Sequence, residues 1–325
     1  MSLNPPQELL HFLDRYSRYF LVGHTEPDGD CLGSQLALGS YLAQRGKEVR
    51  LLSDGPFTRP EVMELSDSFI RDPLPAELDG ASALIMLDCS SPERIGRLKE
   101  SIVHLPTAVI DHHASGEEYG EVSWVIPTAP SVTFMILELI NASQRRVTAD
   151  EARDLFFGLA TDTGFFRHLD ENGAAALKAA AELVAAGASP KATFMRMYGN
   201  RPYGSRKLLR RLLERLTPLA DSRLLYTYET LEDMAELGED ARDSDQLYQL
   251  LLGTRDCEAA VVIREEKNGE CSVGLRSLYD LDVGRIAKEF GGGGHAKAAG
   301  FSYSGSRGEV EKLLLPRLQA LLGQK

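Results

Sequence analysis

The chain has 325 residues, of which 43% are hydrophobic, and a formal net charge of −12 from 36 basic and 48 acidic residues. This length suffices for two domains with separate cores. The acidic balance disfavours a protein that grips long duplex nucleic acid by neutralising many phosphates, but it permits short nucleotides in one basic pocket. No stretch reaches the roughly 18–20 apolar residues of a membrane helix, and the N-terminus lacks a basic region followed by an apolar one. We therefore expect a cytoplasmic protein without a membrane partner.

The four cysteines are scattered and form no CxxC pair, so the sequence indicates neither a disulfide framework nor a structural zinc site. Cys31 and Cys89 lie beside acidic motifs, where a thiolate ligand would select zinc. We interpret both as small buried packing residues, with zinc ligation as the alternative.

The first half alternates β-rich runs with helical patterns, which is typical of parallel βαβ construction. Strands are predicted at 19–23, 48–53, 83–87 and 107–110. A helix over 34–45, with Gly46 as its C-terminal stop, completes the first βαβ unit. Pro27, Gly29 and Gly33 predict a loop before that helix.

Three further helices, at 131–141, 149–161 and 173–186, would cover the sheet. A Gly- and Pro-containing stretch then leads to a helix at about 205–216. Beyond it, the predicted strands are 224–228, 259–264, 271–276 and 300–303, and the predicted helices are 244–252, 283–290 and 308–322. The fold is therefore predicted as α/β with two domains: a parallel-sheet domain over 1–188, a linker and connecting helix over 189–216, and a smaller α/β domain over 217–325.

The first cluster of reactive side chains is His24, Asp28 and Asp30, directly after a predicted strand. In open α/β sheets, ligands bind at the carboxyl ends of the strands, so these residues stand where a site is expected. The alternative is that the two aspartates are turn formers or helix caps.

Three more signals weaken that alternative. Asp88 directly follows the strand at 83–87, and the triplet Asp111-His112-His113 follows the strand at 107–110. Asp162 ends an otherwise apolar helix, where burial of an unpaired carboxylate would be costly. A metal ion would remove that cost.

The donor set itself suggests the metal. Ligation mainly by oxygen, with a minority of imidazole, suits Mn²⁺ or Mg²⁺ better than a closed structural zinc site. Four aspartates and two histidines exceed what one ion requires, which indicates two ions about 3.5–4 Å apart that share a carboxylate. Such a pair activates water for displacement at phosphorus.

These motifs resemble those of the DHH phosphoesterases, a family named for the triplet seen here at 111–113. The match includes His-x-x-x-Asp-x-Asp at 24–30, the lone Asp88, the triplet and the Asp162 segment, in family order. The resemblance implies two overlapping sets of metal ligands. One set is His24, Asp28 and Asp88, and the other is Asp30, Asp88, His112 and Asp162.

The resemblance also implies individual roles. Asp88 would bridge the two ions and, with His113, act in catalysis. His113 would contact the scissile phosphate as a hydrogen-bond donor or acid; the alternative is a packed structural histidine. Asp111 would lie behind the ligands and orient an imidazole.

The second domain resembles the companion domain called DHHA1, through the glycine-rich run 291–300 and Gly274-Leu275-Arg276-Ser277 before it. Glycines let backbone amides approach an anion closely, and Arg276 and His295 are positive donors. Alone, a glycine run is as often a flexible turn. With the other motifs, the resemblance implies substrate binding by Arg276, Ser277, Gly293, Gly294 and His295.

The compact two-domain arrangement resembles the nano-RNase and pAp-phosphatase group. It implies hydrolysis of short oligoribonucleotides to 5′-mononucleotides, removal of the 3′-phosphate of pAp, or both, in a cleft between the domains. The expected cofactors are two divalent ions, Mn²⁺ before Mg²⁺, and the expected partners are short RNA or nucleotides such as pAp; a homodimer is left open. The alternatives are a cyclic-dinucleotide or pGpG phosphodiesterase and, in another class, a non-catalytic nucleotide-binding regulator.

Overall fold

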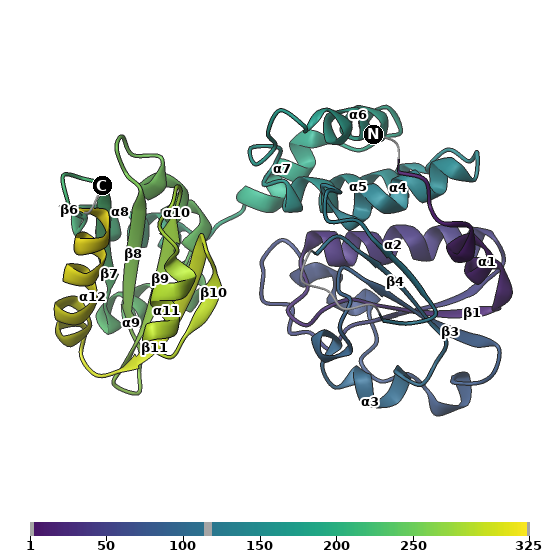
Figure 1. Ribbon diagram of the computed structural model, residues 1–325, viewed down its shortest axis with the longest axis horizontal. Helices are drawn as coiled ribbons and strands as arrows, with labels where there is room; N and C mark the ends of the chain where they lie inside the picture. The colour runs from purple at the N-terminus through teal and green to yellow at the C-terminus, as the bar shows by residue number, and fades with distance from the viewer. Residues whose placement is uncertain (1–2, 114–118, 324–325) are drawn as a thin grey trace. The chain divides into compact units, whose positions relative to one another are not determined.

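The computed structural model describes residues 3–113 and 119–323. The chain divides into two compact units, Met1–Gly199 and Asn200–Lys325. Each unit has its own sheet (Figure 1), which confirms the predicted α/β fold with two domains. Among the residues described, no helix is both long and apolar enough to cross a bilayer.

The first unit is built on a five-stranded parallel sheet in the order β2-β1-β3-β4-β5. Its strands are β1 (Arg18–Val22), β2 (Glu48–Leu52), β3 (Ser82–Leu87), β4 (Thr107–Asp111) and β5 (Val122–Val125). The first four agree with the predicted strands to within one residue. The sequence analysis missed β5, a short edge strand in which only Trp124 is buried.

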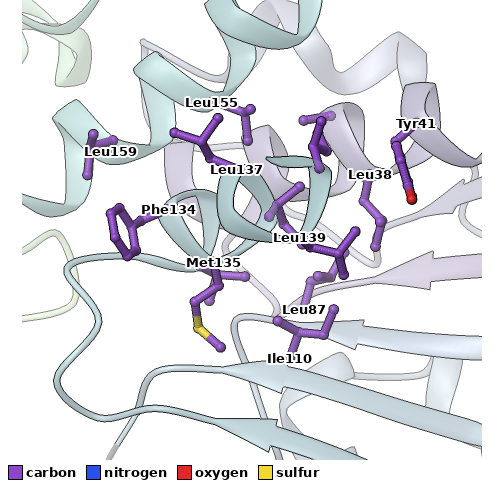
Figure 2. Packing of buried hydrophobic residues seen from close by; sticks show 14 of the residues in the cluster. Leu38, Tyr41, Leu87, Ile110, Phe134, Met135, Leu137, Leu139, Leu155 and Leu159 are labelled. Atoms are coloured by element: carbon purple, nitrogen blue, oxygen red, sulfur yellow. The ribbon is translucent and has the colours of Figure 1, made fainter. Parts of the chain in front are cut away.

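Helices cover both faces of this sheet. Helices α2 (Gly29–Gln44) and α4 (Val132–Ala142) lie on one face, with α5 (Ala149–Asp162) packed against these two helices, and α3 (Leu98–Ile102) lies on the other face (Figure 1). Successive side chains of a strand alternate between faces, so Leu21 enters the first core and Phe20 the second. Figure 2 shows the first core, where Leu87 and Ile110 of the sheet approach Leu139 of α4. Burying such a side chain stabilises the fold by about 1.5–3 kcal/mol.

Three further helices complete the described part of this unit. They are α1 (Gln7–Arg15), α6 (Ala174–Ala185) and α7 (Pro190–Tyr198), with short 3₁₀ turns at η1 (Met63–Ser68), η2 (Pro75–Glu77) and η3 (Pro92–Ile95). Helix α7 falls within the segment expected as a linker, yet it packs on the first unit. The Phe194 ring lies 5.2 Å from that of Phe165, and the Arg196 guanidinium lies 4.0 Å over the Phe157 ring.

The predicted loop before the first helix is shorter than expected: it contains Pro27, but α2 begins at Gly29 rather than near residue 34. Asp28 caps it: its Oδ1 accepts hydrogen bonds from the backbone amides of Asp30 and Cys31, each at 3.1 Å. The glycines that suggested a loop are therefore helical. Asp30, expected in that loop, lies in the first turn of α2.

Close packing between α2 and α5 explains these glycines. A Cβ at Gly29 would lie 2.5 Å from Thr161 Oγ1, and one at Gly33 would lie 2.6 Å from the Asp154 carbonyl oxygen. On the facing helix, a Cβ at Gly158 would lie 2.3 Å from Thr133 Cγ2 and 3.0 Å from Asp30 Cα. Side chains at these positions would force the helices apart.

The second unit contains a mixed six-stranded sheet in the order β10-β11-β9-β8-β7-β6, in which only β7 and β8 pair in parallel among the described strands. The strands are β6 (Thr217–Leu219), β7 (Leu224–Glu229), β8 (Ala259–Glu265), β9 (Glu270–Ser277), β10 (Gly293–His295) and β11 (Ala298–Ser304). The predictions for β7, β8, β9 and β11 are confirmed, but β6 and β10 were missed.

Both faces of the second sheet are also covered. The helices are α8 (Tyr203–Glu214), α9 (Leu231–Leu237), α10 (Ser244–Leu252), α11 (Val283–Glu289) and α12 (Arg307–Leu322), with a 3₁₀ turn at η4 (Glu239–Ala241). Val261 faces the core formed with α11 and α12, whereas Val262 faces the core that contains α8, α9 and α10. Thus α8, expected as a connecting helix, buries Leu208 and Leu212 in the core of the second unit.

The glycine-rich run forms part of a tight hairpin, rather than the flexible turn that a glycine run often forms. Gly293 pairs with Gly300, and Gly294 with Ala299, in the antiparallel pair β10 and β11. Gly294 has φ +134°, and a Cβ there would lie 2.5 Å from the Ala298 carbonyl oxygen. By contrast, a Cβ at Gly293 would meet no atom within 4 Å.

The crossing of α2 and α5 gives a stability prediction. We expect Gly158→Ala to lower the free energy of unfolding, because overpacking typically costs about 1–3 kcal/mol and exceeds the roughly 1 kcal/mol by which alanine is the better helix former. Thermal denaturation would measure the change. Gly308→Ala in α12 is the matched control, since a Cβ there meets no atom within 4 Å. An unchanged melting temperature for Gly158→Ala would contradict the close-packing argument.

Candidate functional site

Asp88 stands at the end of β3, where its backbone adopts a left-handed conformation with φ +59°. Its side chain is 3% exposed, and its two oxygens face different histidines. Oδ2 lies 3.5 Å from His24 Nε2, whereas Oδ1 lies 3.5 Å from His112 Nε2 and 3.6 Å from His113 Nδ1. Oδ1 is buried and has no hydrogen-bond partner among the residues that the structure describes. This carboxylate therefore connects two groups of potential ligands.

The first group lies on the His24 side. His24 Nδ1 lies 2.7 Å from the Thr25 carbonyl oxygen, which fixes that nitrogen as the donor and leaves Nε2 toward Asp88 as a potential ligand. Asp28 extends the group less closely, with Oδ2 3.9 Å from His24 Nε2.

The second group lies on the His112 side. His112 Nδ1 lies 3.1 Å from the Ala129 carbonyl oxygen, and its Nε2 lies 3.4 Å from Asp162 Oδ2. One potential ligand atom from each of Asp30, His112 and Asp162 lies within 4.8 Å of the others. The structure thus brings all six predicted metal ligands to one edge of the sheet.

Asp30 is held by the N-terminus of α4, a contact that the sequence analysis missed. Its Oδ2 accepts a hydrogen bond from the Val132 amide at 2.6 Å. Its Oδ1 accepts bonds from the Thr133 amide and hydroxyl at 2.9 and 2.6 Å. The amides and dipole of a helix N-terminus stabilise a carboxylate. Ser131, the N-cap of α4, signals where that helix begins, but nothing local shows that Asp30 faces it.

The cluster of negative charge changes the protonation of its members. Burial and neighbouring carboxylates raise the pKa values of Asp30 and Asp162. For His112, burial favours the neutral ring, but Asp88, Asp162 and Asp30 outweigh it and raise the pKa to about 10. Burial likewise opposes the charge on Asp88, yet His112 and His24 lower its pKa to about 2. Divalent cations fit such a site, because they would neutralise the carboxylates and supply a partner for Asp88 Oδ1.

Asp111 lies behind the cluster and binds the triplet histidines. Its Oδ1 accepts hydrogen bonds from His113 Nδ1 at 2.8 Å and from the amides of His112 and His113 at 2.7 and 3.1 Å. Asp111 is fully buried, whereas the His113 side chain is 41% exposed. The Asp111 hydrogen bond is the main cause of the raised pKa of His113, although burial opposes it.

Cys31 and Cys89 are both buried. Burial, reinforced by Asp88, raises the pKa of each thiol. Cys31 Sγ lies within 4.8 Å of potential ligand atoms of His24 and Asp88. Burial of both cysteines fits the packing interpretation.

In the second unit, Arg276 and Ser277 end β9. The Arg276 guanidinium lies 4.7 Å over the Tyr248 ring, and its Nη1 donates to the Leu275 carbonyl oxygen. Ser277 donates its hydroxyl proton inward, to the carbonyl oxygen of Leu281 at 2.7 Å. His295 is exposed on β10. Of these three predicted substrate contacts, Ser277 already uses its hydroxyl proton in a hydrogen bond within the second unit.

The structure adds a charged residue that the sequence analysis missed. Arg59, in the loop after β2, places Nη1 3.5 Å from Asp28 Oδ2. No motif marks this arginine, because its loop joins the site only in three dimensions.

Comparison with known proteins identifies both domains. The model for the N-terminal domain of the DHH family matches residues 18–187, and that for the DHHA1 domain matches residues 222–323. Two proteins named bifunctional oligoribonuclease and PAP phosphatase NrnA are similar. The Thermus thermophilus protein is 31% identical over 88% of this chain and 84% of its own length. The Bacillus subtilis protein is 26% identical over 91% of this chain and 92% of its own length.

A solved structure supports the fold over the whole length. The crystal structure of an exopolyphosphatase-related protein from Bacteroides fragilis matches with a TM-score of 0.86 and 22% identity, covering 98% of this chain and 97% of that one. The family models and the Thermus relative together extend over most of the sequence. The chain therefore belongs to the DHH family of phosphoesterases.

Proposed function

We propose that this protein hydrolyses short oligoribonucleotides to 5′-mononucleotides and removes the 3′-phosphate of pAp, using two divalent cations. Mn²⁺ is the preferred ion, with Mg²⁺ as the alternative, because the proposed ligands are mainly carboxylates with two imidazoles. Both reactions are displacements at phosphorus, so one site serves them.

The observation that carries the proposal is the position of Asp88 between two ligand groups. Its Oδ2 faces His24, and its buried Oδ1, which has no hydrogen-bond partner in the described part of the chain, faces His112. A carboxylate whose oxygens serve different groups has the arrangement that a bridging ligand requires. We assign His24, Asp28 and Asp88 to one ion. The other ion is assigned to Asp30, Asp88, His112 and Asp162.

When bound, the ion pair would supply an activated water and stabilise the charge that develops at phosphorus. His113 would act beside it. Asp111 holds His113 Nδ1 and favours the protonated ring, so the other ring nitrogen would donate to a phosphate oxygen or the leaving group. The partial exposure of His113 is compatible with this contact.

The second domain would hold a part of the nucleotide remote from the reacting bond. Arg276 would supply a positive donor, His295 a ring N–H, and Gly293 and Gly294 backbone amides. Gly293 supports this role, since no atom of the described residues lies within 4 Å of a Cβ at this position and packing therefore does not explain the glycine. Ser277 would act by fixing the end of β9, because its hydroxyl binds Leu281.

Short nucleotides are favoured over other phosphate esters by the two relatives named oligoribonuclease and PAP phosphatase, which match nearly the whole chain. The net charge of −12 agrees with a substrate that has few phosphates rather than a long duplex.

A substrate panel tests the proposed function. The purified protein with Mn²⁺ is expected to release product from pAp and pApA faster than from pGpG, cyclic dinucleotides, longer RNA or pyrophosphate. EDTA should abolish turnover, and Mn²⁺ should restore more activity than Mg²⁺. Faster hydrolysis of a cyclic dinucleotide or pGpG would assign that alternative substrate. Nucleotide binding without any turnover would favour a non-catalytic regulator, and activity that persists in EDTA would refute metal dependence.

Asp88→Asn tests the bridge. This change keeps the side-chain shape and removes the charge, and asparagine tolerates a left-handed backbone. Loss of a residue that orients a metal ligand typically lowers metal affinity or activity by about 10–100-fold. Loss of a ligand shared by both ions should therefore lower kcat by more than about 100-fold. Calorimetric titration with Mn²⁺ should show fewer bound ions. The matched control is Asp256→Asn, an exposed aspartate with φ +66°. Near-normal kcat for Asp88→Asn would refute the bridging role.

His295→Ala tests the second domain. Its removal should mainly raise KM for pAp, by roughly 10-fold or more if it loses one hydrogen bond to a charged phosphate, while kcat changes little. Steady-state kinetics separate the two constants. His104→Ala, an exposed histidine before β4, is the control. An unchanged KM would remove His295 from the binding site.

A further inference from the structure

Arg59 lies at the edge of the cluster of metal-ligand candidates. Its side chain is 51% exposed, and Nη1 lies 3.5 Å from Asp28 Oδ2. The loop that carries it follows β2, the edge strand beside β1, and none of the motifs of the first domain includes it. The residue therefore combines a permanent positive charge, solvent access and closeness to a proposed metal ligand.

The backbone around Arg59 is fixed although its side chain is exposed. Its carbonyl oxygen accepts hydrogen bonds from the amides of Val62 and Met63 at 3.0 and 3.2 Å, and Val62 is fully buried. On one side of this turn, the Gly55 carbonyl oxygen accepts the Glu26 amide at 3.0 Å. On the other, Arg196 Nε donates to the Glu61 carbonyl oxygen at 2.8 Å. The loop is thus tied both to the segment that carries Asp28 and to α7.

The two oxygens of Asp28 have different partners. Oδ1 accepts the amides of Asp30 and Cys31 and so caps α2. Oδ2 faces both His24 Nε2, at 3.9 Å, and Arg59 Nη1. Since Oδ2 is the oxygen left for a cation, a divalent ion held by His24, Asp28 and Asp88 would compete with Arg59 for it.

The Arg59 guanidinium can exchange its partner Asp28 for a phosphate. Arg59 and Asp28 are 3.5 Å apart and the arginine is half exposed, so this ion pair contributes little to stability and its loss would be tolerated. Arginine also has five N–H donors in a planar fork that matches the oxygens of a phosphate. A phosphate at the metal centre would lie within reach of a side chain already beside Asp28.

We infer that Arg59 binds the scissile phosphate of the substrate, on the His24 side of Asp88, while His113 acts on the His112 side. In this role Arg59 contacts a non-bridging oxygen of the phosphate and neutralises the part of its negative charge that the metal ions do not. The inference rests on the proposed function for the identity of the substrate. The ligand chemistry itself, a phosphate group, follows from the position of Arg59.

The test compares Arg59→Ala and Arg59→Lys with the wild type. Arg153→Ala is the matched control, because Arg153 is 57% exposed and pairs with an exposed aspartate, Asp150. Two quantities are measured by calorimetry on Mn²⁺-loaded protein: the Kd for inorganic phosphate and the Kd for a pAp analogue with a non-hydrolysable 3′-phosphonate. Mn²⁺ affinity is measured separately, and KM and kcat are determined for pAp.

For Arg59→Ala we expect both Kd values and KM to rise roughly 10- to 100-fold, the range for loss of a charge-assisted hydrogen bond. Arg59→Lys should recover only part of this, because an ammonium lacks the planar fork. Mn²⁺ affinity should stay equal to that of the wild type or rise slightly, within about 2-fold, since Arg59 does not bind the ion and its removal ends a weak competition for Asp28 Oδ2.

Two results would overturn the inference. Weaker Mn²⁺ binding with unchanged phosphate binding would mean that Arg59 serves only to position Asp28. Unchanged values throughout would mean that the pair with Asp28 is an ordinary surface contact. Failure of the proposed function is a separate outcome: a wild type inactive on every substrate of the panel would refute that function, while the binding measurements would still decide the role of Arg59.

Discussion

The accumulation of aspartates at the carboxyl edge of one parallel sheet is the constraint on which the rest of the first domain depends. Like charges this close repel one another, and burial withdraws the water that would screen them. Burial, and after it the neighbouring carboxylates, raises the pKa values of Asp30 and Asp162. A fold that keeps such a cluster must supply positive charge from elsewhere, and the structure does so through backbone dipoles, imidazoles and one arginine.

Two helix N-termini provide part of this compensation. Asp28 caps α2, and Asp30, in the first turn of α2, is itself bound by the amides that begin α4. The positive ends of both helices therefore meet the acidic edge. Histidines provide another part, each anchored through Nδ1 so that Nε2 faces a carboxylate: His24 on the Thr25 carbonyl and His112 on the Ala129 carbonyl. The site is thus set up by backbone groups that no side-chain motif contains.

The contrast between side-chain motifs and the backbone groups that hold them explains which features the sequence could predict. The strands of the first sheet and the acidic residues after them were predictable, because a buried parallel strand is a continuous apolar run and its carboxyl end has a fixed place in the fold. The start of α2 was not, because Gly29 and Gly33 suggest a loop locally and become helical through their fit against α5. The same applies to Arg59, which reaches Asp28 only through folding, and to the inward hydroxyl of Ser277. Short edge strands such as β5 and β10 bury too few side chains to leave a clear pattern.

The glycine-mediated crossing of α2 and α5 has a consequence for how the site varies among sequences. Asp30 belongs to one of these helices and Asp162 to the other, and the helices meet where Gly29 and Gly158 leave no room for side chains. The spacing of these two carboxylates is therefore set by direct approach of two backbones rather than by loop conformation. Substitutions on the outer faces of both helices leave this contact untouched, whereas a side chain at Gly29 or Gly158 would push apart the two helices that carry these carboxylates.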